Sequence, residues 1–343
     1  MGESAPMPHE WNRARSATLK DVAREVGVCE STVSVVLNGA RSGTRVSERT
    51  REAVITAARR LGYRPNGQAR SLVTGRTGRI ALYCGSSVVD RRNLFFMEVM
   101  CGMLAACDSR GLNLLIHGPG RNEADILNLV SNRSVDGIVM VALSDDPMIG
   151  LLNDLKVPAI SIGDRIPGLP CVVTDDAAGG VMQAEYLSYR GHRRVLYRAS
   201  QVQYDSAKTR QQAFVTRATE LGMDVMVVSE PTGFFSRLSR PEWEAIEDAQ
   251  HPVTAIVGWE DVVAGLICEE LRSAGRRVGQ EIDVIGFNGF EYVMRPVQRL
   301  TSIDAHWWEI GEKSVELLET LLNGGSISPK TTFPVHFIQG ETA

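Results

Sequence analysis

The sequence predicts a small all-helical head followed by a larger α/β body that contains parallel sheets. Apolar residues recur at helical spacing through residues 18–61, and from Arg79 onward short apolar runs alternate with helical patterns. With 343 residues, the chain is long enough for a small module and a large region with its own core. Together these three observations predict two folding units with a boundary close to residue 78.

The first predicted helix follows Thr18, which can cap it, while Asp21 is an acidic partner for the free amides of the first turn. Gly27 then permits a left-handed turn that a side chain would resist. The apolar stripe of this helix consists of Val22, Ala23 and Val26.

The second predicted helix, over residues 30–38, packs through one face and leaves its beginning exposed. Its apolar face consists of Val33, Val36 and Leu37. The side chains that point outward at its start are Glu30, Ser31, Ser34 and Val35. A short helix that presents its N-terminal side chains, braced by another helix, is the geometry that enters a DNA major groove. An ordinary helical hairpin is the alternative interpretation.

A third helix is predicted after Ser47, a good N-cap, and Gly62 ends it as a C′ glycine. Its apolar positions are Val54, Ile55, Ala58 and Leu61. Residues 63–76 contain too few apolar residues for a core helix, and Gly67 lowers the helix propensity by about 1 kcal/mol relative to alanine. We expect this segment to be weakly helical alone and to fold when a partner is present.

Short strands alternate with helical stretches through the body. The predicted strands cover residues 79–84, 113–116, 137–141, 159–162, 171–174, 194–198, 225–228, 255–258 and 283–286. One intervening helix has an apolar face of Phe96, Val99, Met100, Met103, Leu104 and Cys107. The alternation predicts parallel sheets covered on both faces, with right-handed crossovers. A region of this length usually forms two subdomains, and ligands of open α/β sheets sit at the carboxyl ends of the strands.

Charge and cysteine usage exclude several classes of protein. The whole chain carries −4 and residues 1–77 carry +6, so residues 78–343 carry −10. A basic head on an acidic body favours a nucleic-acid partner for the head alone, with a chance fluctuation of surface charge as the alternative. The six cysteines show neither metal-ligand spacing nor a disulfide framework, which indicates reduced thiols in a cytoplasmic protein. No metal or cofactor is predicted.

Targeting segments are not predicted either. No apolar run approaches the length that crosses a membrane, so no membrane partner is expected. Residues 1–16 are polar and lack the apolar core of a signal peptide, and we expect a disordered tail there.

Several short runs of the head occur in a specific order and spacing. They are Thr18-Leu19-Lys20-Asp21-Val22-Ala23, Gly27-Val28, Ser31-Thr32-Val33-Ser34, Leu37-Asn38-Gly39, Val46-Ser47, Thr50-Arg51, Leu61-Gly62-Tyr63-Arg64-Pro65-Asn66 and Ala69-Arg70-Ser71-Leu72. In this pattern the chain resembles the lactose/galactose repressor (LacI/GalR) family of bacterial transcription regulators. The resemblance continues, more loosely, to the C-terminus.

The resemblance implies a fold and a division into domains. The fold is an N-terminal helix-turn-helix three-helix head with a hinge helix, then a periplasmic-binding-protein-like pair of doubly wound parallel-sheet subdomains. The implied parts are a disordered tail over 1–16, a DNA-binding domain over 17–64, a hinge helix and linker over 65–77, and an effector-binding and dimerisation domain over 78–343. The two subdomains cover about 78–174 with 304–334 and about 175–303 with 335–343, and a ligand occupies the cleft.

The resemblance also implies which residues touch DNA. The family's phosphate contacts, which position a protein without reading sequence, fall on Thr18, Thr32, Ser34, Asn38, Tyr63 and Asn66. Base reading falls on Leu19, Glu30, Ser31 and Val35. Leu72 stands where the family wedges an apolar residue into the minor groove at the centre of a two-fold site, and a small core contact is the alternative. Its neighbours on the hinge are Ala69, on the same helical face, and Arg70, which can neutralise phosphate.

Three positions depart from the family pattern at the reading helix. Val35 replaces an arginine that would read guanine for about 1–3 kcal/mol of discrimination, and it can only meet a thymine methyl. Glu30 can accept from a cytosine amine, or serve only as a solvated partner of the helix dipole. Cys29 replaces a serine cap and is a weaker cap. We therefore expect DNA binding but no particular operator sequence.

Ligand contacts are implied in the body. The aromatic residues Phe95 and Phe96 can stack on a sugar, or pack in the core. The family's polar ligand positions fall on Ser86, Asp164, Ser206, Arg210, Glu260 and Asn288. Aromatic residues in the same set are Phe234, Trp259 and Trp307. Arg210 can bind two sugar hydroxyls or a carboxylate through its guanidinium fork, and an exposed first-turn arginine is the alternative.

The function implied is that of a repressor that binds a palindromic double-stranded DNA operator as a homodimer, because two half-sites related by a dyad require a two-fold dimer. The small effector is expected to be a carbohydrate, with an unusual or phosphorylated sugar, a nucleobase or no effector as alternatives. Induction and corepression differ only in whether the effector weakens or strengthens DNA binding, and the sequence leaves both alternatives open. No enzyme is expected because nucleophile, phosphate-loop and metal motifs are missing. A secreted sugar-binding receptor would need a signal peptide and no DNA-binding head.

Overall fold

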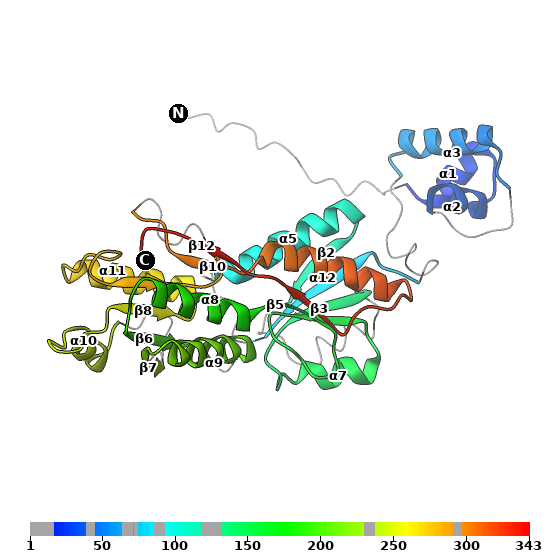
Figure 1. The fold of residues 1–343 in the computed structure, drawn as a ribbon. Helices are drawn as coiled ribbons and strands as arrows, with labels where there is room; N and C mark the ends of the chain where they lie inside the picture. The colour runs from blue at the N-terminus through cyan, green and yellow to red at the C-terminus, as the bar shows by residue number, and fades with distance from the viewer. Residues whose placement is uncertain are drawn as a thin grey trace, which may run out of the picture. The chain divides into compact units, whose positions relative to one another are not determined.

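The computed structural model describes residues 17–38, 45–63, 71, 75–85, 93–117, 132, 134–202, 204–229, 237–290 and 297–343. The chain divides into two compact units, Met1–Gly78 and Arg79–Ala343 (Figure 1). We call them the head and the body.

In the described part of the head, three helices surround a small apolar core. They are α1 (Leu19–Val26), α2 (Glu30–Asn38) and α3 (Glu48–Arg60). The buried residues of this core are Val22, Ala23, Val33, Val54, Ala57 and Ala58, which all three helices supply. The predicted apolar faces therefore meet one another, and the beginning of α2 is left outside the core.

Local sequence signals set the ends of these helices. Thr18 and Asp21 form the predicted cap of α1, since Thr18 Oγ1 accepts from the Asp21 amide at 3.3 Å and the Thr18 amide donates to the Asp21 carboxylate at 2.9 Å. Gly27 has φ 72° and Gly62 has φ 65°, the left-handed conformation that glycine adopts without strain. Ser47 caps α3 by accepting from the Thr50 amide.

The described residues of the body form two parallel sheets. The first sheet has the strand order β11-β5-β4-β3-β1-β2, with strands β1 (Arg79–Cys84), β2 (Asn113–His117), β3 (Gly137–Val141), β4 (Ala159–Ile162), β5 (Cys171–Thr174) and β11 (Lys330–Phe333). The second sheet has the order β7-β6-β8-β9, with strands β6 (Arg194–Ala199), β7 (Asp224–Ser229), β8 (Ala255–Gly258) and β9 (Asp283–Ile285). All neighbours within both sheets are parallel.

Helices cover both sheets. Those associated with the first sheet are α5 (Leu94–Arg110), α7 (Met148–Leu155) and α12 (Trp307–Leu322). Those associated with the second sheet are α8 (Asp176–Tyr189), α9 (Asp205–Glu220), α10 (Arg240–Ile246) and α11 (Asp261–Ser273). Each sheet is thereby buried on both faces, which explains why β3, β4, β5 and β8 are mostly apolar and fully buried.

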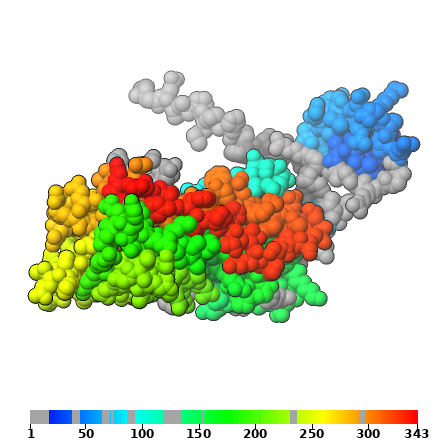
Figure 2. All heavy atoms as spheres, viewed as in Figure 1, coloured from blue at the N-terminus to red at the C-terminus, as the bar shows by residue number. Residues whose placement is uncertain are grey.

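Three segments connect the two sheets. The chain passes from β5 into α8, returns through β10 (Ser302–Asp304), and passes a third time between β11 and β12 (His336–Ile338). Strands β10 and β12 pair antiparallel between the sheets. The C-terminal segment runs over the visible face of the body in Figure 2. A connection made of three chain segments allows the two sheets to move relative to one another about a common hinge.

The predicted fold class is confirmed, and all the predicted strands form within two residues of their expected ends. One expectation about packing is wrong. Leu104 was assigned to the buried face of α5, but it is 45% exposed, as is Met97 at 44%. The helix carries apolar residues around most of its circumference, so periodicity alone could not separate its inner from its outer face. No helix among the described residues is long and apolar enough to cross a bilayer.

Candidate functional site

The first candidate site is the exposed beginning of α2. Glu30 and Ser31 are exposed, and Thr32, Ser34 and Val35 are half-buried. Val33, fully buried between them, fixes the helix to the core of the head. The result is a row of small and acidic side chains on a braced helix N-terminus, where unpaired amides attract phosphate oxygens.

Cys29 occupies the cap position of this helix. Its carbonyl accepts from the amides of Thr32 at 3.0 Å and Val33 at 3.3 Å. Its thiol lies 3.0 Å from the hydroxyls of Ser31 and Thr32. These hydrogen bonds, first that of Ser31, lower the pKa of the exposed thiol to about 7. The thiol therefore stands where the family pattern has a serine cap, and it places an ionisable group at the beginning of α2.

The other predicted DNA contacts differ in how far they are exposed. Thr18 is exposed at the cap of α1, whereas Leu19 and Tyr63 are half-buried and pack against the core of the head. Asn38 is the last residue of α2, and its side chain is not described. The predicted hinge contacts that lie outside the described residues are Asn66, Ala69, Arg70 and Leu72.

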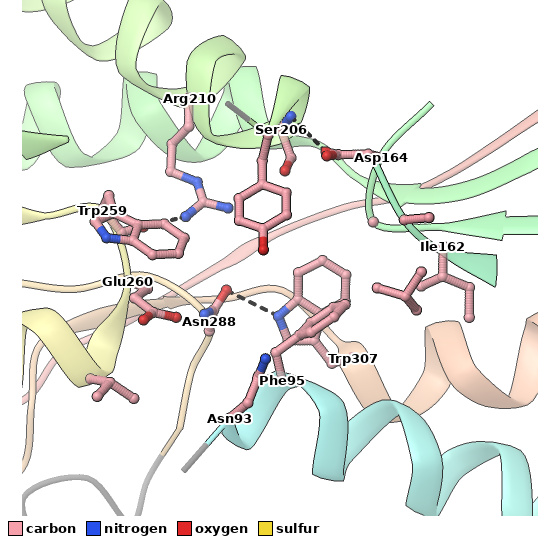
Figure 3. Close-up of a pocket in the computed structure, with 15 residues that line it drawn as sticks. Asn93, Phe95, Ile162, Asp164, Ser206, Arg210, Trp259, Glu260, Asn288 and Trp307 are labelled. Carbon is pink, nitrogen blue, oxygen red and sulfur yellow. Dashed lines mark hydrogen bonds between the residues drawn. The ribbon is translucent and has the colours of Figure 1, made fainter. Parts of the chain in front are cut away.

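The second candidate site is a pocket in the body, with about 740 Å³ of space that is partly open to solvent. Its described lining residues follow the carboxyl ends of strands β3, β4, β6, β8 and β9 or begin helices α5 and α12, as Figure 3 shows for those drawn. They are Asn93, Phe95, Val141, Ala142, Ile162, Gly163, Asp164, Tyr204, Ser206, Arg210, Trp259, Glu260, Val262, Asn288 and Trp307. Both sheets contribute, which is where open α/β sheets bind ligands.

Arg210, on α9, is 3% exposed, and protein groups already engage its guanidinium. Nε and Nη2 donate to Asp176 Oδ1 at 3.2 and 2.7 Å, and Nη1 donates to the carbonyl of Trp259 (Figure 3). The guanidinium also lies 3.3 Å above the ring centre of Phe287. Burial raises the pKa of Asp176 to about 6, although Arg210 acts in the opposite direction. The charge of Arg210 is therefore balanced by Asp176, and three of its five N–H groups donate to protein acceptors.

A hydrogen bond joins the two halves of the pocket. Asp164 follows β4 of the first sheet, and its Oδ1 accepts from the Ser206 amide at 2.8 Å, in the first turn of α9 beside the second sheet (Figure 3). The N-terminal end of a helix stabilises a carboxylate. Even so, burial raises the pKa of Asp164 above its usual value.

Two pairs of aromatic rings form the walls. Phe95 and Trp307 meet edge to face with ring centres 4.6 Å apart. Tyr204 and Trp259 are stacked with ring centres 6.3 Å apart. Trp307 Nε1 donates to Asn288 Oδ1 at 3.0 Å, which fixes the indole plane (Figure 3). Each half of the pocket thus presents flat apolar surface with a polar edge, as sugar-like and heterocyclic ligands require.

A buried carboxylate supports the loop that carries Asn288. Asp261 begins α11, and its side chain accepts from the Phe290 amide at 2.7 Å and from Ser302 Oγ at 2.6 Å. A Cβ at Gly286 would lie 2.0 Å from Asp261 Oδ1, so only glycine fits there. Asn288 itself has φ 117°, a conformation that non-glycine residues rarely adopt. These contacts hold the Asn288 amide in its position at the pocket.

The structure brings together most of the residues that the sequence indicated for ligand binding. The lining includes the predicted residues Phe95, Asp164, Ser206, Arg210, Trp259, Glu260, Asn288 and Trp307. Phe96 does not reach the pocket and packs against the core of the first sheet. Ser86 and Phe234 lie outside the described residues.

Three of the residues that sequence reasoning missed at this site carry polar groups. Asp176 is the partner that the buried arginine on the neighbouring helix needs, but no local pattern in the sequence indicates this pairing. Asn93 caps α5 by accepting from the Phe96 amide at 3.1 Å, and an asparagine before an apolar helix is a signal that could have found it. Tyr204 precedes α9 in a loop that carries no such local signal.

Comparisons with known proteins find separate family matches in the head and in the body. Residues 18–66 match the family model "Bacterial regulatory proteins, lacI family", and residues 184–343 match "Periplasmic binding protein-like domain". The transcriptional repressor PurR of Erwinia tasmaniensis is 29% identical and covers 88% of this chain and 89% of its own length. The transcriptional regulator CelR of Thermobifida fusca is 29% identical and covers 95% of this chain and 96% of its own length.

Solved structures resemble the whole chain. A complex of the regulator CelR with cellobiose aligns with a TM-score of 0.67 and 25% identity over 95% of this chain and all of that one. The Lac repressor dimer bound to operator and an anti-inducer aligns with a TM-score of 0.78 over 96% of this chain and 99% of that one, and at 23% identity it shows the fold alone. The head and body together define a helix-turn-helix protein with a periplasmic-binding-protein-like body. The chain belongs to the LacI family of DNA-binding transcriptional regulators.

Proposed function

We propose that this protein is a repressor that binds a two-fold symmetric operator as a homodimer, under the control of a small effector in the pocket of the body. The observation that carries the proposal is the braced α2 helix, whose exposed N-terminal residues Glu30 and Ser31 stand clear of a packed core. The names of the relatives, repressors and regulators of transcription, support the same function. We assign no catalytic role and expect the protein to act in the cytoplasm.

Phosphate contacts are proposed for the predicted residues Thr18, Thr32, Ser34, Asn38, Tyr63 and Asn66, and base contacts for Leu19, Glu30, Ser31 and Val35. The exposed carboxylate of Glu30 favours an adjacent cytosine, because the cytosine amine is a donor in the major groove. Valine at position 35 favours a thymine methyl. The hinge contacts proposed are Ala69, Arg70 and Leu72.

Control by the effector is supported by the composition of the pocket. Both sheets supply lining residues, and the bond from the Ser206 amide to Asp164 joins the halves directly. A ligand that favours one spacing of the halves shifts the population of that conformation. The sign of the effect, induction or corepression, depends on which conformation binds the operator.

A homodimer is supported by unpartnered apolar surface on the first sheet. Met97 and Leu104 lie on the outer face of α5, and Ile116, 49% exposed, lies on the edge strand β2. Exposed apolar residues on neighbouring elements of this kind mark interfaces. A second copy covers such a patch through an isologous contact, which gives the two-fold axis that a palindromic site requires.

The test of this function is selection of DNA by the full-length protein from a pool of random duplexes. We expect an enriched sequence with two-fold symmetry, and we expect Glu30→Gln to change the preferred base at one symmetry-related pair of positions. The head variant Thr56→Ala, at an exposed position of α3, is the control and should leave the preference unchanged. A pool that shows no enriched sequence would overturn the proposal.

A further inference from the structure

The loop that carries Asn288 into the pocket is bound to a strand that crosses between the two sheets. This loop, residues 286–290, follows β9 of the second sheet. The Asn288 amide donates to the Ile303 carbonyl at 2.8 Å, and the Gly289 amide donates to Ser302 Oγ at 3.3 Å. Both acceptors belong to β10, one of the three segments that connect the sheets. A displacement of the loop therefore acts on β10.

The side chain of Asn288 is bound to the same segment of the chain. Its Oδ1 accepts from the indole N–H of Trp307, which follows β10 and begins α12 (Figure 3). Its backbone has φ 117°, a conformation that persists in a non-glycine residue only when the surrounding contacts impose it. Both the main chain and the side chain of this pocket residue therefore depend on residues 302–307.

Asp261 joins the loop and β10 to the second sheet. It begins α11, is fully buried, and its amide donates to the Phe287 carbonyl at 2.9 Å. Its Oδ1 accepts from Ser302 Oγ at 2.6 Å, and its Oδ2 accepts from the Phe290 amide at 2.7 Å. One carboxylate therefore holds together a helix of the second sheet, the loop of the pocket and the crossing strand.

A second crossing segment is bound to β10. Strands β10 and β12 pair antiparallel, and ring nitrogens of His306 and His336 lie 2.6 Å apart beside them. Two of the three connections between the sheets thus form one unit. Contacts that act on β10 therefore act on the hinge between the sheets.

From these contacts we infer that Asp261 is a positioning residue that connects an effector bound at Asn288 to the hinge strand β10, and that its carboxylate form makes this connection. The inference rests on the proposed function of the pocket as the effector site. The Phe290 amide can only donate, whereas the Ser302 hydroxyl can donate or accept. The bond that a proton on Asp261 can reverse is therefore the one to Ser302, whose Oγ also accepts from Gly289.

The surroundings of Asp261 place this change near neutral pH. From the loop and from β10 it faces backbone amides and the Ser302 hydroxyl, and from α9 it faces the charge of Arg210. Burial raises its pKa to about 7, although these hydrogen bonds and the charge of Arg210 act in the opposite direction. The connection is therefore complete above this pH and rearranged below it.

The test follows Trp307 by fluorine NMR in the full-length protein labelled with 5-fluorotryptophan, without DNA or ligand. Trp307→Phe assigns the resonance among the five tryptophans, and Trp243 of α10, assigned in the same way, is an internal control. We expect the Trp307 resonance to move between pH 6 and 8 with a midpoint close to 7. An asparagine side chain resembles the protonated carboxyl group. Asp261→Asn should therefore hold the resonance near the position that the wild type reaches at pH 6.

Ser302→Ala separates a connecting role from a merely structural one. Asp261 still titrates in this variant, so urea unfolding should keep its dependence on pH. The bond to β10 is missing, so the shift of the Trp307 resonance should shrink about twofold or more. Ser273→Ala removes an exposed hydroxyl from α11 and is the matched control, which should keep both the shift and the dependence on pH.

The inference is overturned if the Trp307 resonance does not move with pH, and equally if Asp261→Asn or Ser302→Ala keeps the full shift. These measurements use no DNA, so their failure is distinguishable from failure of the proposed function. A protein that selects a symmetric duplex but lacks the shift contradicts only the inference about Asp261. A protein that selects no duplex contradicts the proposed function and, with it, the inference.

Discussion

At the scale of the residue, burial raises the pKa of the acids that support the pocket. Asp261 is fully buried and accepts hydrogen bonds from Ser302 and Phe290, yet desolvation still raises its pKa to about 7. Burial is also the main cause that raises the pKa of Asp176. Between the unfolded and the folded pKa values, the native state therefore keeps these carboxyl groups protonated while the unfolded chain has released the protons. The stability of the fold consequently depends on pH.

We predict that Asp261→Asn flattens the pH dependence of stability. The folded pKa of about 7 lies above the unfolded value near 3.8, so the stabilising contribution of this group is complete below pH 3.8 and is lost as pH rises to 7. Each proton difference corresponds to about 1.4 kcal/mol per pH unit. Urea unfolding across that range measures it, and parallel curves for wild type and variant would contradict the assignment.

Cys29 gives a second prediction at this scale. Its thiol has a pKa of about 7 and lies at the cap of the helix proposed to enter the groove. As pH rises through 7 the thiolate adds negative charge next to DNA phosphates, so operator affinity should fall. Cys29→Ser should remove the pH dependence and keep the cap. Fluorescence anisotropy titrations between pH 6 and 8 test this, and an equal slope in both proteins would count against it.

At the scale of the element, close helix packing depends on glycine. Helices α8 and α9 pack together, and a Cβ at Gly180 of α8 would lie 2.4 Å from the Arg210 carbonyl of α9. Alanine there must push the two helices apart and displace Arg210 from the pocket.

We therefore predict that Gly180→Ala destabilises the body by about 1–3 kcal/mol, even though alanine favours a helix intrinsically. Gly150→Ala in α7 is the matched control, because nothing lies within 4 Å of a Cβ at that position. The control should be neutral or slightly stabilising in thermal unfolding. Equal melting temperatures for the two variants would show that α8 and α9 are not held as closely as described.

Elements with strong local signals could be predicted from the sequence, and contacts between distant elements could not. The strands follow from buried apolar runs between turns, and the ends of α1 and α3 follow from Thr18, Ser47 and the glycines. The eight predicted residues that line the pocket came from resemblance to a family. The pairing of Arg210 with Asp176, and the exposure of Leu104, depend on how helices pack in three dimensions. The apolar periodicity of a single segment does not show how that segment packs against others.

At the scale of the whole molecule, two copies are needed to bind a symmetric site. The outer face of α5 with the edge strand β2 is the surface proposed for the second copy, through Met97, Leu104 and Ile116.

We predict that Leu104→Glu converts the dimer to monomer and weakens operator binding strongly, because a buried unpaired carboxylate is costly at an interface. Val227→Glu is the control, since Val227 is similarly exposed at 41% on the edge strand β7 of the second sheet. Sedimentation velocity gives the oligomeric state. A dimer that persists with Leu104→Glu, or that dissociates with both substitutions, would place the interface elsewhere.

The proposed function requires that the pocket of the body controls DNA binding by the head. Its most direct test is the affinity of the selected operator for wild type and for Asp164→Ala, measured by anisotropy. The variant loses the hydrogen bond between Asp164 and Ser206, so the populations of the two arrangements shift. We predict a change in operator affinity of about fivefold or more, with unchanged affinity for a random duplex. Equal operator affinity in both proteins would contradict the claim.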